Sequence, residues 1–408
     1  MVRMAFRFYF CAALAFPLVA DSQNVVQRIQ RPSQSVLQQQ ARELEGAFDV
    51  MMVSLQPGFE DASVLAYFRQ ERGAKVVSVY VTNGEEGESD ISALYPHQLA
   101  GLRRSEAYSL GKALDCETHF MNFPDVSSPA DTTRVRKFWG RHELVSRLTT
   151  LLSQYRPDIV LLSRDPRAGS ASPLMSVLRK DMVAAVRRAD LFYRWSVNRV
   201  FLEGGTGKTF RVPLEQLNRV NSKSYTEIGE ELLGEYASLA TQRKSWVERS
   251  SGYSLIHMEP GSTIRFMDEG LPRPSSKDIR PTETKLKGFL KQLTGFVPEQ
   301  SDTSAQRLVL DRLTVLVDSI DRGIAQSRNL SWRDTKKIVH WKTTLERVRN
   351  TVLGVSVSFA LSETVVAPRQ LSFLSVDSVA GIRAPGTTEI YFPGVQQQWI
   401  INEGLESR

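Results

Sequence analysis

Residues 49–60, DVMMVSLQPGFE, place a short apolar run directly before a Pro-Gly turn. A run of this length that is bounded by a turn is typical of a strand buried on both faces. Residues 75–82, KVVSVYVT, have the same character, and residues 62–72 between the two runs have helical spacing that ends before Gly73. Glycine commonly follows the last turn of a helix. The order strand, helix, strand therefore predicts a parallel pair of strands.

The alternation of strands and helices continues along the chain. We expect helices over residues 99–114 and 141–155, and strands over residues 118–123 and 159–163. Alternation at this interval predicts an α/β domain, with a Rossmann-like parallel sheet and flanking helices. Ligands of such sheets lie beyond the carboxyl ends of the strands. The loops at that edge are residues 56–61, 82–98, 123–140 and 164–173.

A glycine-rich stretch at residues 204–209, GGTGKT, is similar to a phosphate-binding loop but lacks two of its requirements. The position that needs a further glycine is Leu202, and the stretch FRVP follows where a helix would have to begin. We therefore predict a hairpin turn between strands over residues 199–202 and 210–212, with a helix over residues 226–246 after them.

Changes in composition divide the chain into parts. We predict a signal peptide at residues 1–20, an N-terminal lead-in at 21–44, the α/β domain at 45–250, a linker at 251–282, a helical region at 283–353 and a short C-terminal β-rich tail at 354–408. The linker is inferred from its prolines, glycines and serines. The tail is inferred from period-two alternation such as Val355, Val357 and Phe359.

The first residues have the layout of a secretory signal. Arg3 and Arg7 precede an apolar stretch at residues 8–19, and the small residue Ala20 follows it. The stretch is shorter than the roughly 20 residues that span a membrane, which disfavours the alternative of an anchor. We expect export to the periplasm or the extracellular space, with no transmembrane segment after cleavage and Cys116 as the only remaining cysteine.

The composition excludes several classes of protein. Hydrophobic residues are 41% and charged residues 24% of the chain, which indicates an ordinary globular protein and not a disordered one. The formal charge of +7 is spread along the chain without a basic stripe, so we expect no nucleic-acid partner. Two cysteines rule out a disulfide scaffold.

Taken together, the loops resemble the zinc-dependent N-acetylglucosamine deacetylases known as PIG-L or LmbE-like proteins, in their larger exported bacterial form. The matching stretches are QPGFE at 56–60, TNGEEG at 82–87, RRSE at 103–106, NFPD at 122–125, FWG at 138–140, RPD at 156–158, SRDPRAG at 163–169 and SYTEI at 224–228. No single stretch is specific to this family, but the occurrence of all eight in the family's order is. The resemblance covers about residues 45–250 and implies the LmbE-like fold.

The residues at the functional positions of that family differ. The resemblance implies a zinc site in which His and Asp of the first loop and His of the last loop bind the metal, and a second first-loop Asp is the general base. This chain has Gln56 and Phe59 at the first-loop ligand positions, Gly58 at the base, Pro173 at the last-loop ligand and Ser170 at the neighbouring histidine. None of these side chains supplies the chemistry of an open zinc site. We therefore expect no catalytic residues, no metal and no cofactor.

A residual pocket is expected from the polar residues of the same loops. They are Glu60, Asp61, Asn83, Glu85, Arg103, Glu106 and Asp165. Such a pocket would suit a glycan or an amino sugar, with Phe59 stacked on a sugar ring. The structural alternatives are an ion pair of Glu60 with Arg103 or Arg104, and a turn at Asp165 that only ends its strand.

Three functional hypotheses remain open at this point. The favoured one is an exported, non-catalytic relative of the deacetylases that binds a glycan or acts as a scaffold. The second is an active N-acetyl sugar hydrolase with a rearranged carboxylate site around Glu60, Asp61 and Asp165. The third is a structural protein whose helical region at residues 283–352 mediates assembly.

Overall fold

The computed structural model describes residues 34–353, apart from short gaps and the longer stretches 241–251, 259–265 and 272–279. Beyond residue 353 it describes only four strands. The chain forms two compact units, residues 32–352 with 385–408, and residues 1–31 with 353–384. The signal-peptide prediction lies outside the described residues.

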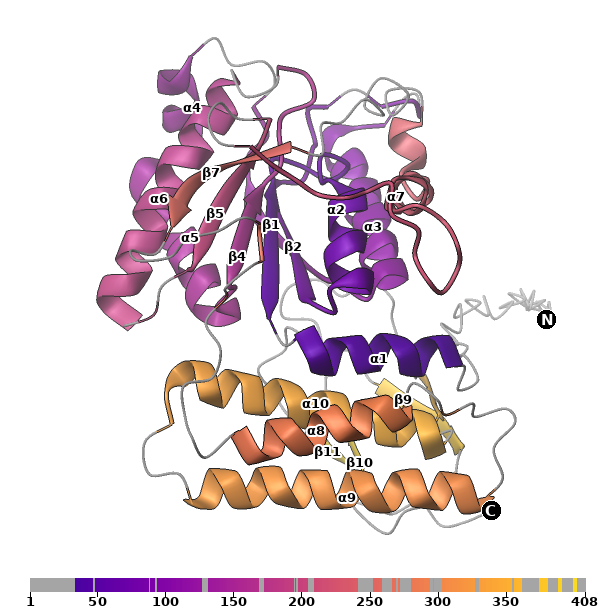
Figure 1. The fold of residues 1–408 in the computed structure, drawn as a ribbon. Helices are drawn as coiled ribbons and strands as arrows, with labels where there is room; N and C mark the ends of the chain where they lie inside the picture. Colours follow the sequence, from indigo (N-terminus) through magenta and orange to yellow (C-terminus); the bar gives the residue numbers. More distant parts are fainter. Residues whose placement is uncertain are drawn as a thin grey trace, which may run out of the picture. The chain divides into compact units, whose positions relative to one another are not determined.

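The first unit contains a sheet of seven strands in the order β3-β2-β1-β4-β5-β7-β6 (Figure 1). The first five strands of that order run parallel, and β7 and β6 are added antiparallel at one edge. Their bounds are β1 Asp49–Ser54, β2 Lys75–Thr82, β3 Glu117–Phe123, β4 Ile159–Leu162, β5 Arg199–Glu203, β6 Thr209–Arg211 and β7 Gly252–Met258. The predicted α/β class with a mostly parallel sheet is confirmed.

The helices of this α/β part cover both faces of the sheet (Figure 1). One group contains α2 Ala62–Ala66, the single-turn segment Tyr67–Glu71, α3 Pro96–Leu114 and α7 Tyr225–Leu233, and the other contains α4 Thr132–Trp139, α5 Arg141–Tyr155 and α6 Pro173–Tyr193. Every residue of β1 and β4 is buried, as expected for central strands of a sheet with helices on both faces.

Three of the sequence predictions for this domain are wrong. The sheet does not end before residue 250, because β7 lies within the expected linker. Strands β5 and β6 do not form a hairpin, because β7 lies between them and pairs with both. The helix expected to reach residue 246 ends at Leu233, and a short 3-10 turn follows at Ala237–Leu239; residues 241–250 lie outside the described residues.

A second hydrophobic core is formed by helices alone. Helix α1, Gln34–Gly46, contributes Leu37, Ala41 and Leu44 to it. The remaining members come mainly from α8 Arg280–Leu293, α9 Thr303–Gln326 and α10 Trp332–Leu353. The lead-in expected at residues 21–44 therefore contains most of a helix that belongs to the helical region.

The strands after residue 353 form two small antiparallel pairs. In the second unit β8 Ser356–Leu361 pairs with β9 Leu374–Ala380. In the first unit β10 Thr388–Ile390 pairs with β11 Trp399–Ile401. The prediction that the tail is rich in strands is thus consistent with the part of it that the structure describes.

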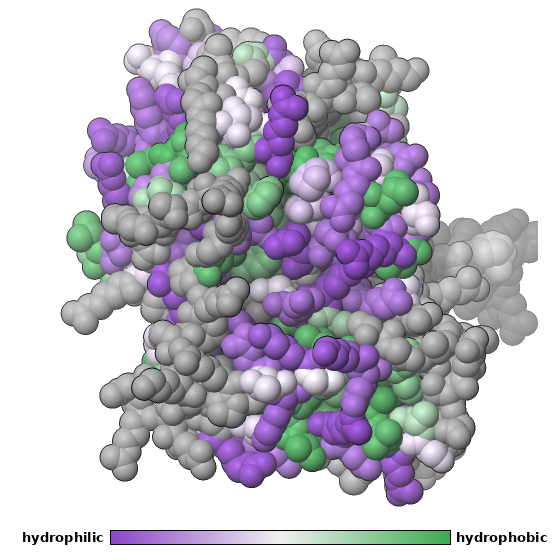
Figure 2. All heavy atoms as spheres, viewed as in Figure 1, coloured by the Kyte–Doolittle hydropathy of each residue, from purple (hydrophilic) through white to green (hydrophobic). Residues whose placement is uncertain are grey.

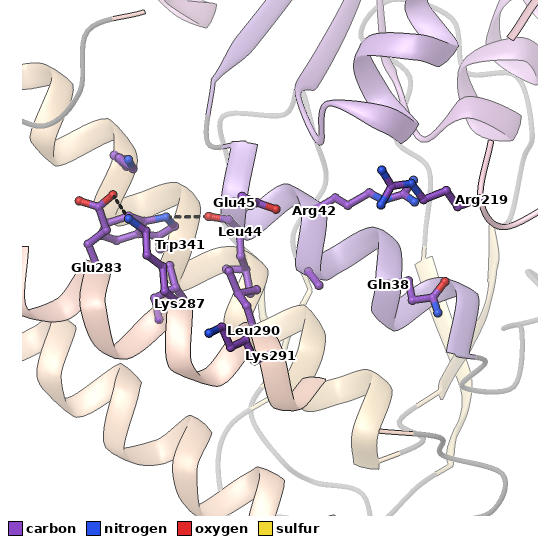
Figure 3. A pocket seen from close by; sticks show the side chains of 13 residues that line it. Gln38, Arg42, Leu44, Glu45, Arg219, Glu283, Lys287, Leu290, Lys291 and Trp341 are labelled. Carbon is purple, nitrogen blue, oxygen red and sulfur yellow. Dashed lines mark hydrogen bonds and ion pairs between the residues drawn. The ribbon is translucent and has the colours of Figure 1, made fainter. Parts of the chain in front are cut away.

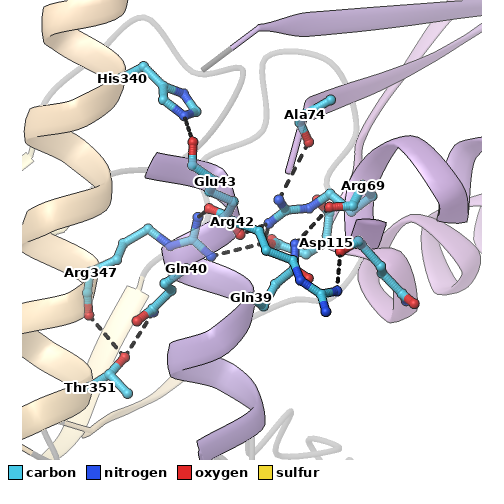
Figure 4. A network of polar contacts seen from close by, with 11 residues as sticks. Gln39, Gln40, Arg42, Glu43, Arg69, Ala74, Asp115, His340, Arg347 and Thr351 are labelled. Carbon is cyan, nitrogen blue, oxygen red and sulfur yellow. Dashed lines mark hydrogen bonds and ion pairs between the residues drawn. The ribbon is translucent and has the colours of Figure 1, made fainter. Parts of the chain in front are cut away.

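An ion-pair network around the buried Glu43 and Arg69 joins the helical core to the α/β part (Figure 4). The Glu43 carboxylate of α1 lies 2.6 Å from the Arg69 guanidinium and 2.8 Å from the guanidinium of Arg347 in α10. Arg69 and Arg347 also both pair with Asp115. Burial alone would lower the pKa of Arg69, but the charges of Glu43 and Asp115 outweigh it and raise that pKa.

A second ionic contact holds α10 against the amino ends of β1 and β4. The Lys336 ammonium lies 3.0 Å from Asp49, the first residue of β1, and 3.1 Å from Asp158, just before β4. It also donates to the Arg156 carbonyl at 2.7 Å. Burial alone would lower the pKa of Lys336, but the two carboxylates outweigh it and raise the pKa above its ordinary value of 10.5.

This raised pKa gives a prediction for alkaline stability. The folded protein holds the Lys336 proton more tightly than the unfolded chain does. The contribution of the charged Lys336 to stability is therefore complete below pH 10.5 and is lost as the pH rises through the pKa of the folded state. Urea unfolding from about pH 9.5 to pH 12 should therefore show a steeper decline in the free energy of unfolding above about pH 10.5 in wild type than in Lys336→Met. Lys180→Met, at an exposed position of α6, should retain the wild-type slope. Equal slopes for all three proteins would contradict the prediction.

The surface of the described part mixes polar and apolar residues on the face that Figure 2 shows. Among the described helices, none is both long enough and apolar enough to cross a membrane.

Candidate functional site

The predicted site residues lie at the carboxyl edge of the sheet, as expected. Strand β1 is hydrogen-bonded to β2 on one side and to β4 on the other, so the order of strands reverses at β1. In open α/β sheets this reversal point is where ligands bind. The loop of Gln56–Asp61 follows β1, Asn83 and Glu85 follow β2, and Asp165 follows β4. Arg103 and Glu106 approach from α3.

The turn after β1 has a backbone that requires glycine at residue 58. Gly58 has a φ of 86°, in the left-handed region that side chains other than glycine disfavour. Its N–H donates to the Glu60 carboxylate at 2.8 Å, and the Phe59 N–H donates to the Gln56 carbonyl at 3.2 Å. A residue with a side chain would therefore be disfavoured at position 58.

Phe59 is part of the core and does not face solvent. It is 1% exposed, and the Arg167 guanidinium lies over its ring, 4.9 Å from the ring centroid. The expectation that this ring stacks on a sugar is therefore wrong for this structure, because protein atoms already cover it. Gln56 beside it is also buried.

Two tyrosines from later in the chain bind the carboxylates of the first loop. The Tyr236 hydroxyl donates to Glu60 at 2.6 Å, and the Tyr253 hydroxyl donates to Asp61 at 3.0 Å. The other Asp61 oxygen caps α2 by accepting the Val64 N–H at 3.1 Å. Both carboxylates are buried. Burial, and after it the Glu60 charge, raises the pKa of Tyr236 well above its ordinary value, so this hydroxyl stays a donor.

Asp165 is held in a turn at the end of β4. Its carboxylate accepts the Ser172 hydroxyl at 2.9 Å, and it accepts both the backbone N–H and the side-chain Nε of Arg167, at 3.0 and 3.1 Å. These contacts agree with the structural alternative given above, in which the turn at Asp165 only ends its strand. Pro173 begins α6, whereas Ser170 lies outside the described residues.

Arg103 fills the space beneath the loop after β2. Its side chain is fully buried and Nη1 donates to the Gly84 carbonyl at 2.6 Å. A Cβ at Gly84 or Gly87 would meet this guanidinium at 2.6 or 2.3 Å, so both glycines permit a close approach. Burial lowers the pKa of Arg103.

The remaining acidic residues join loops to one another. The Asp125 N–H donates to Glu85 at 2.9 Å, and the Glu86 N–H donates to Asp125 at 3.2 Å. Burial and the charge of Glu85 raise the pKa of Asp125. Glu106 of α3 accepts the Ser238 hydroxyl at 2.6 Å and its N–H at 2.9 Å. Asn83 is half-buried. These contacts join the loops at the carboxyl edge of the sheet to one another.

The residues at the family's zinc positions do not fit zinc. Gln56 offers a neutral amide, and Phe59 and Pro173 offer no donor atom, whereas zinc takes thiolate, imidazole or carboxylate ligands. In the part of the chain that the structure describes, no three His, Cys, Asp or Glu side chains gather as a metal-ligand group. His97 and His142 are both exposed, and the His97 ring stacks on Tyr95.

Sequence reasoning missed Tyr236, Tyr253 and Ser238. Tyr236 and Ser238 fall in the stretch expected to be one long helix, and Tyr253 falls in the expected linker. Residues 252–258, GYSLIHM, contain Tyr253, Leu255, Ile256 and Met258, and this largely apolar run was the signal for a further strand that could bring Tyr253 to the site.

Comparison with solved structures finds several that are similar to about half of this chain. A conserved protein of Thermus thermophilus is 15% identical (53% of this chain, 98% of that chain, TM-score 0.37). An N,N′-diacetylchitobiose deacetylase of Pyrococcus horikoshii is 17% identical (52% and 87%, TM-score 0.36). A 4-carboxy-2-hydroxymuconate hydratase of Pseudomonas putida is 16% identical (53% and 99%, TM-score 0.34). No curated protein matches the chain.

A family model gives the more specific result. The model of PIG-L, GlcNAc-PI de-N-acetylase, matches residues 62–170. That range runs from α2 to the turn after β4 and includes three of the four loops in full or nearly so. Residues 62–170 are therefore similar to the PIG-L family.

Proposed function

We propose that this PIG-L-like domain is non-catalytic and acts as an interaction scaffold. The observation that carries the proposal is the closed first loop: Phe59 lies in the core, where the resemblance places a metal ligand, and Arg167 covers its ring. Burial of an aromatic side chain stabilises the fold but leaves no room there for a metal-bound water and an acetamide.

The nearby carboxylates support the same conclusion. Glu60 and Asp61 accept hydrogen bonds from Tyr236 and Tyr253, and Asp165 is bonded to Ser172 and Arg167. A rearranged hydrolase would need at least one of them free to bind a cation or activate water. Releasing one would also leave a buried polar partner unpaired, at a cost of about 1–3 kcal/mol. The hydrolase alternative is thus disfavoured by the existing contacts.

Zinc content and acetate release test this proposal together. The full chain would be purified, incubated with zinc, desalted and analysed for bound metal. It would then be assayed for acetate release from N-acetylglucosamine and N,N′-diacetylchitobiose. We expect substoichiometric zinc and no acetate above a heat-denatured control. Asp165→Ala serves as the matched variant, because the rearranged-site hypothesis requires this carboxylate.

Stoichiometric zinc accompanied by acetate release would overturn the proposal. If acetate release were also abolished in Asp165→Ala, with an unchanged thermal transition, the rearranged carboxylate site would be established instead. Acetate release that persists in Asp165→Ala at the wild-type rate and through repeated purification would also overturn the proposal, and it would exclude a rearranged site that depends on Asp165.

A further inference from the structure

Helix α6 ends in three consecutive apolar residues that are open to solvent. Leu191 is 80% exposed, Phe192 70% and Tyr193 49%. Successive residues of a helix point about 100° apart, so these side chains project in three directions around the helix end. We call them the apolar tip. Single exposed apolar residues are common on protein surfaces, whereas a contiguous group of large ones marks a surface that binds a partner.

The rest of the exposed face of α6 is mainly cationic. Four basic side chains are exposed on this helix, against one exposed acidic side chain, Asp190. The four are Arg179, Lys180, Arg187 and Arg188. The other acidic residue of the helix, Asp181, is buried and pairs with Arg136 of α4. The exposed face of α6 therefore carries a net positive charge.

These four cations are not engaged by the described part of the chain. Their charged groups form no ion pair and no hydrogen bond with any described residue. The Arg188 guanidinium lies over the Phe192 ring, 5.5 Å from the ring centroid. This contact holds a positive charge beside the apolar tip without neutralising it.

Another group of basic side chains differs in this respect. It lines a cavity of about 610 Å³ beside α1, α8 and α10 (Figure 3). Lys287 of that cavity lies 3.6 Å from Glu283, and Lys337 lies over the ring of Trp341, 5.0 Å from its centroid. The cations of α6 are therefore the better candidates for binding an anionic partner outside the chain.

The shape of the apolar tip favours a lipid bilayer over a protein as that partner. Because Leu191, Phe192 and Tyr193 point in three directions, a flat protein surface would cover only part of the tip. Lipids rearrange around an inserted group and can surround all three side chains. Arg187 and Arg188 lie one helical turn before the tip, about 6 Å along the axis. This offset suits cations at the lipid phosphates and apolar groups about 5–10 Å into the interface.

We propose that the end of α6 binds an anionic lipid bilayer, with the apolar tip inserted at the headgroup level and Arg187 and Arg188 at the lipid phosphates. Helix α6 begins beside the carboxyl-edge loops, and its 21 residues span about 30 Å (Figure 1). The tip is therefore at the opposite edge of the α/β part, and membrane binding leaves the carboxyl-edge loops uncovered. This inference does not depend on whether the PIG-L-like domain is catalytic.

Flotation of the full chain with lipid vesicles tests the proposal. Vesicles of phosphatidylglycerol and phosphatidylcholine in equal parts are compared with vesicles of phosphatidylcholine alone. We expect the protein to float with the anionic vesicles, to float much less with the neutral ones, and to be released from the anionic vesicles as salt is added.

Substitutions on α6 and matched substitutions on α9 locate the binding surface. Arg187→Glu should lower the partition coefficient about fivefold or more, because each basic residue near an anionic membrane adds to the attraction. Leu191→Ser should lower it about tenfold, because less apolar area is buried in the bilayer. Arg312→Glu and Leu308→Ser make the same changes, also four residues apart, at exposed positions of α9 and should leave it unchanged.

Several results would overturn the proposal. Equal flotation with both kinds of vesicle would remove the role of lipid charge, and equal losses in the α6 and α9 variants would show general adsorption of a basic protein. A loss in Arg187→Glu without one in Leu191→Ser would show that the tip stays outside the bilayer. Absence of flotation, with retention on immobilised polyglutamate that Arg187→Glu abolishes, would assign the surface to an acidic protein instead. Circular dichroism and the thermal transition of each variant confirm that the variants are folded.

Discussion

Replacing Glu43 by alanine should lower the free energy of unfolding by about 3–5 kcal/mol. The substitution leaves Arg69, a buried guanidinium, without its buried partner. Asp115 remains beside Arg69, but its side chain is 65% exposed and cannot fully replace a buried carboxylate. Arg347 loses its 2.8 Å contact as well. Urea unfolding followed by circular dichroism measures the loss.

Two variants on the same helix sharpen this prediction. Glu45→Ala makes the same chemical change at an exposed position two residues away and should cost less than about 0.5 kcal/mol. Glu43→Gln keeps the shape and one acceptor oxygen, so its effect should lie between those of the two alanine variants. A Glu43→Ala protein as stable as Glu45→Ala would contradict the view that this network holds α1 to the α/β part.

Phe59→Ala should destabilise the protein by about 3–5 kcal/mol, the range for truncating a fully buried phenylalanine. The loss combines the burial of the ring, the cavity left behind and the contact with Arg167. Thermal or urea unfolding of the purified variant gives the value. The size of the loss distinguishes a core residue from a sugar-binding residue. A ring that serves to bind a sugar would be exposed, and its removal would scarcely affect stability.

Phe138→Ala is the matched control for that experiment. Phe138 is 49% exposed on α4, so its truncation should cost much less than that of Phe59. If Phe59→Ala retained wild-type stability and lost affinity for an N-acetylated sugar, the first loop would be a binding surface and the closed site proposed above would be wrong.

The parallel part of the sheet could be predicted because its signals are local. Residues 49–54 and 75–82 are short apolar runs with a helical segment between them, and these features alone indicate parallel pairing. The position of Asp165 and Glu60 at one edge follows from the same topology. The order of β5, β7 and β6 could not be predicted, because it depends on which segments distant in the sequence pair with one another.

The closure of the candidate site was only half predictable. Gln56, Gly58 and Phe59 are enough to predict that zinc is not bound, since this prediction depends only on residue type. The partners of the neighbouring carboxylates depend on contacts across long sequence separations. Tyr236 is 176 residues from Glu60, and Tyr253 is 192 residues from Asp61. Nothing local to either tyrosine specifies its partner, so a pocket of free acidic groups was expected where buried hydrogen bonds are found.

The helical core has a consequence for how the chain acquires its structure during synthesis. The Trp341 indole donates to the Leu44 carbonyl across 297 residues, and both side chains belong to one buried cluster. Helix α1 therefore emerges from the ribosome long before its partners α8, α9 and α10 exist. Contacts of such long range close slowly, because chain entropy must be lost before they form. Until α8 has been synthesised, Leu37 and Leu44 lack the partners of their buried cluster and are a target for chaperones or for premature association.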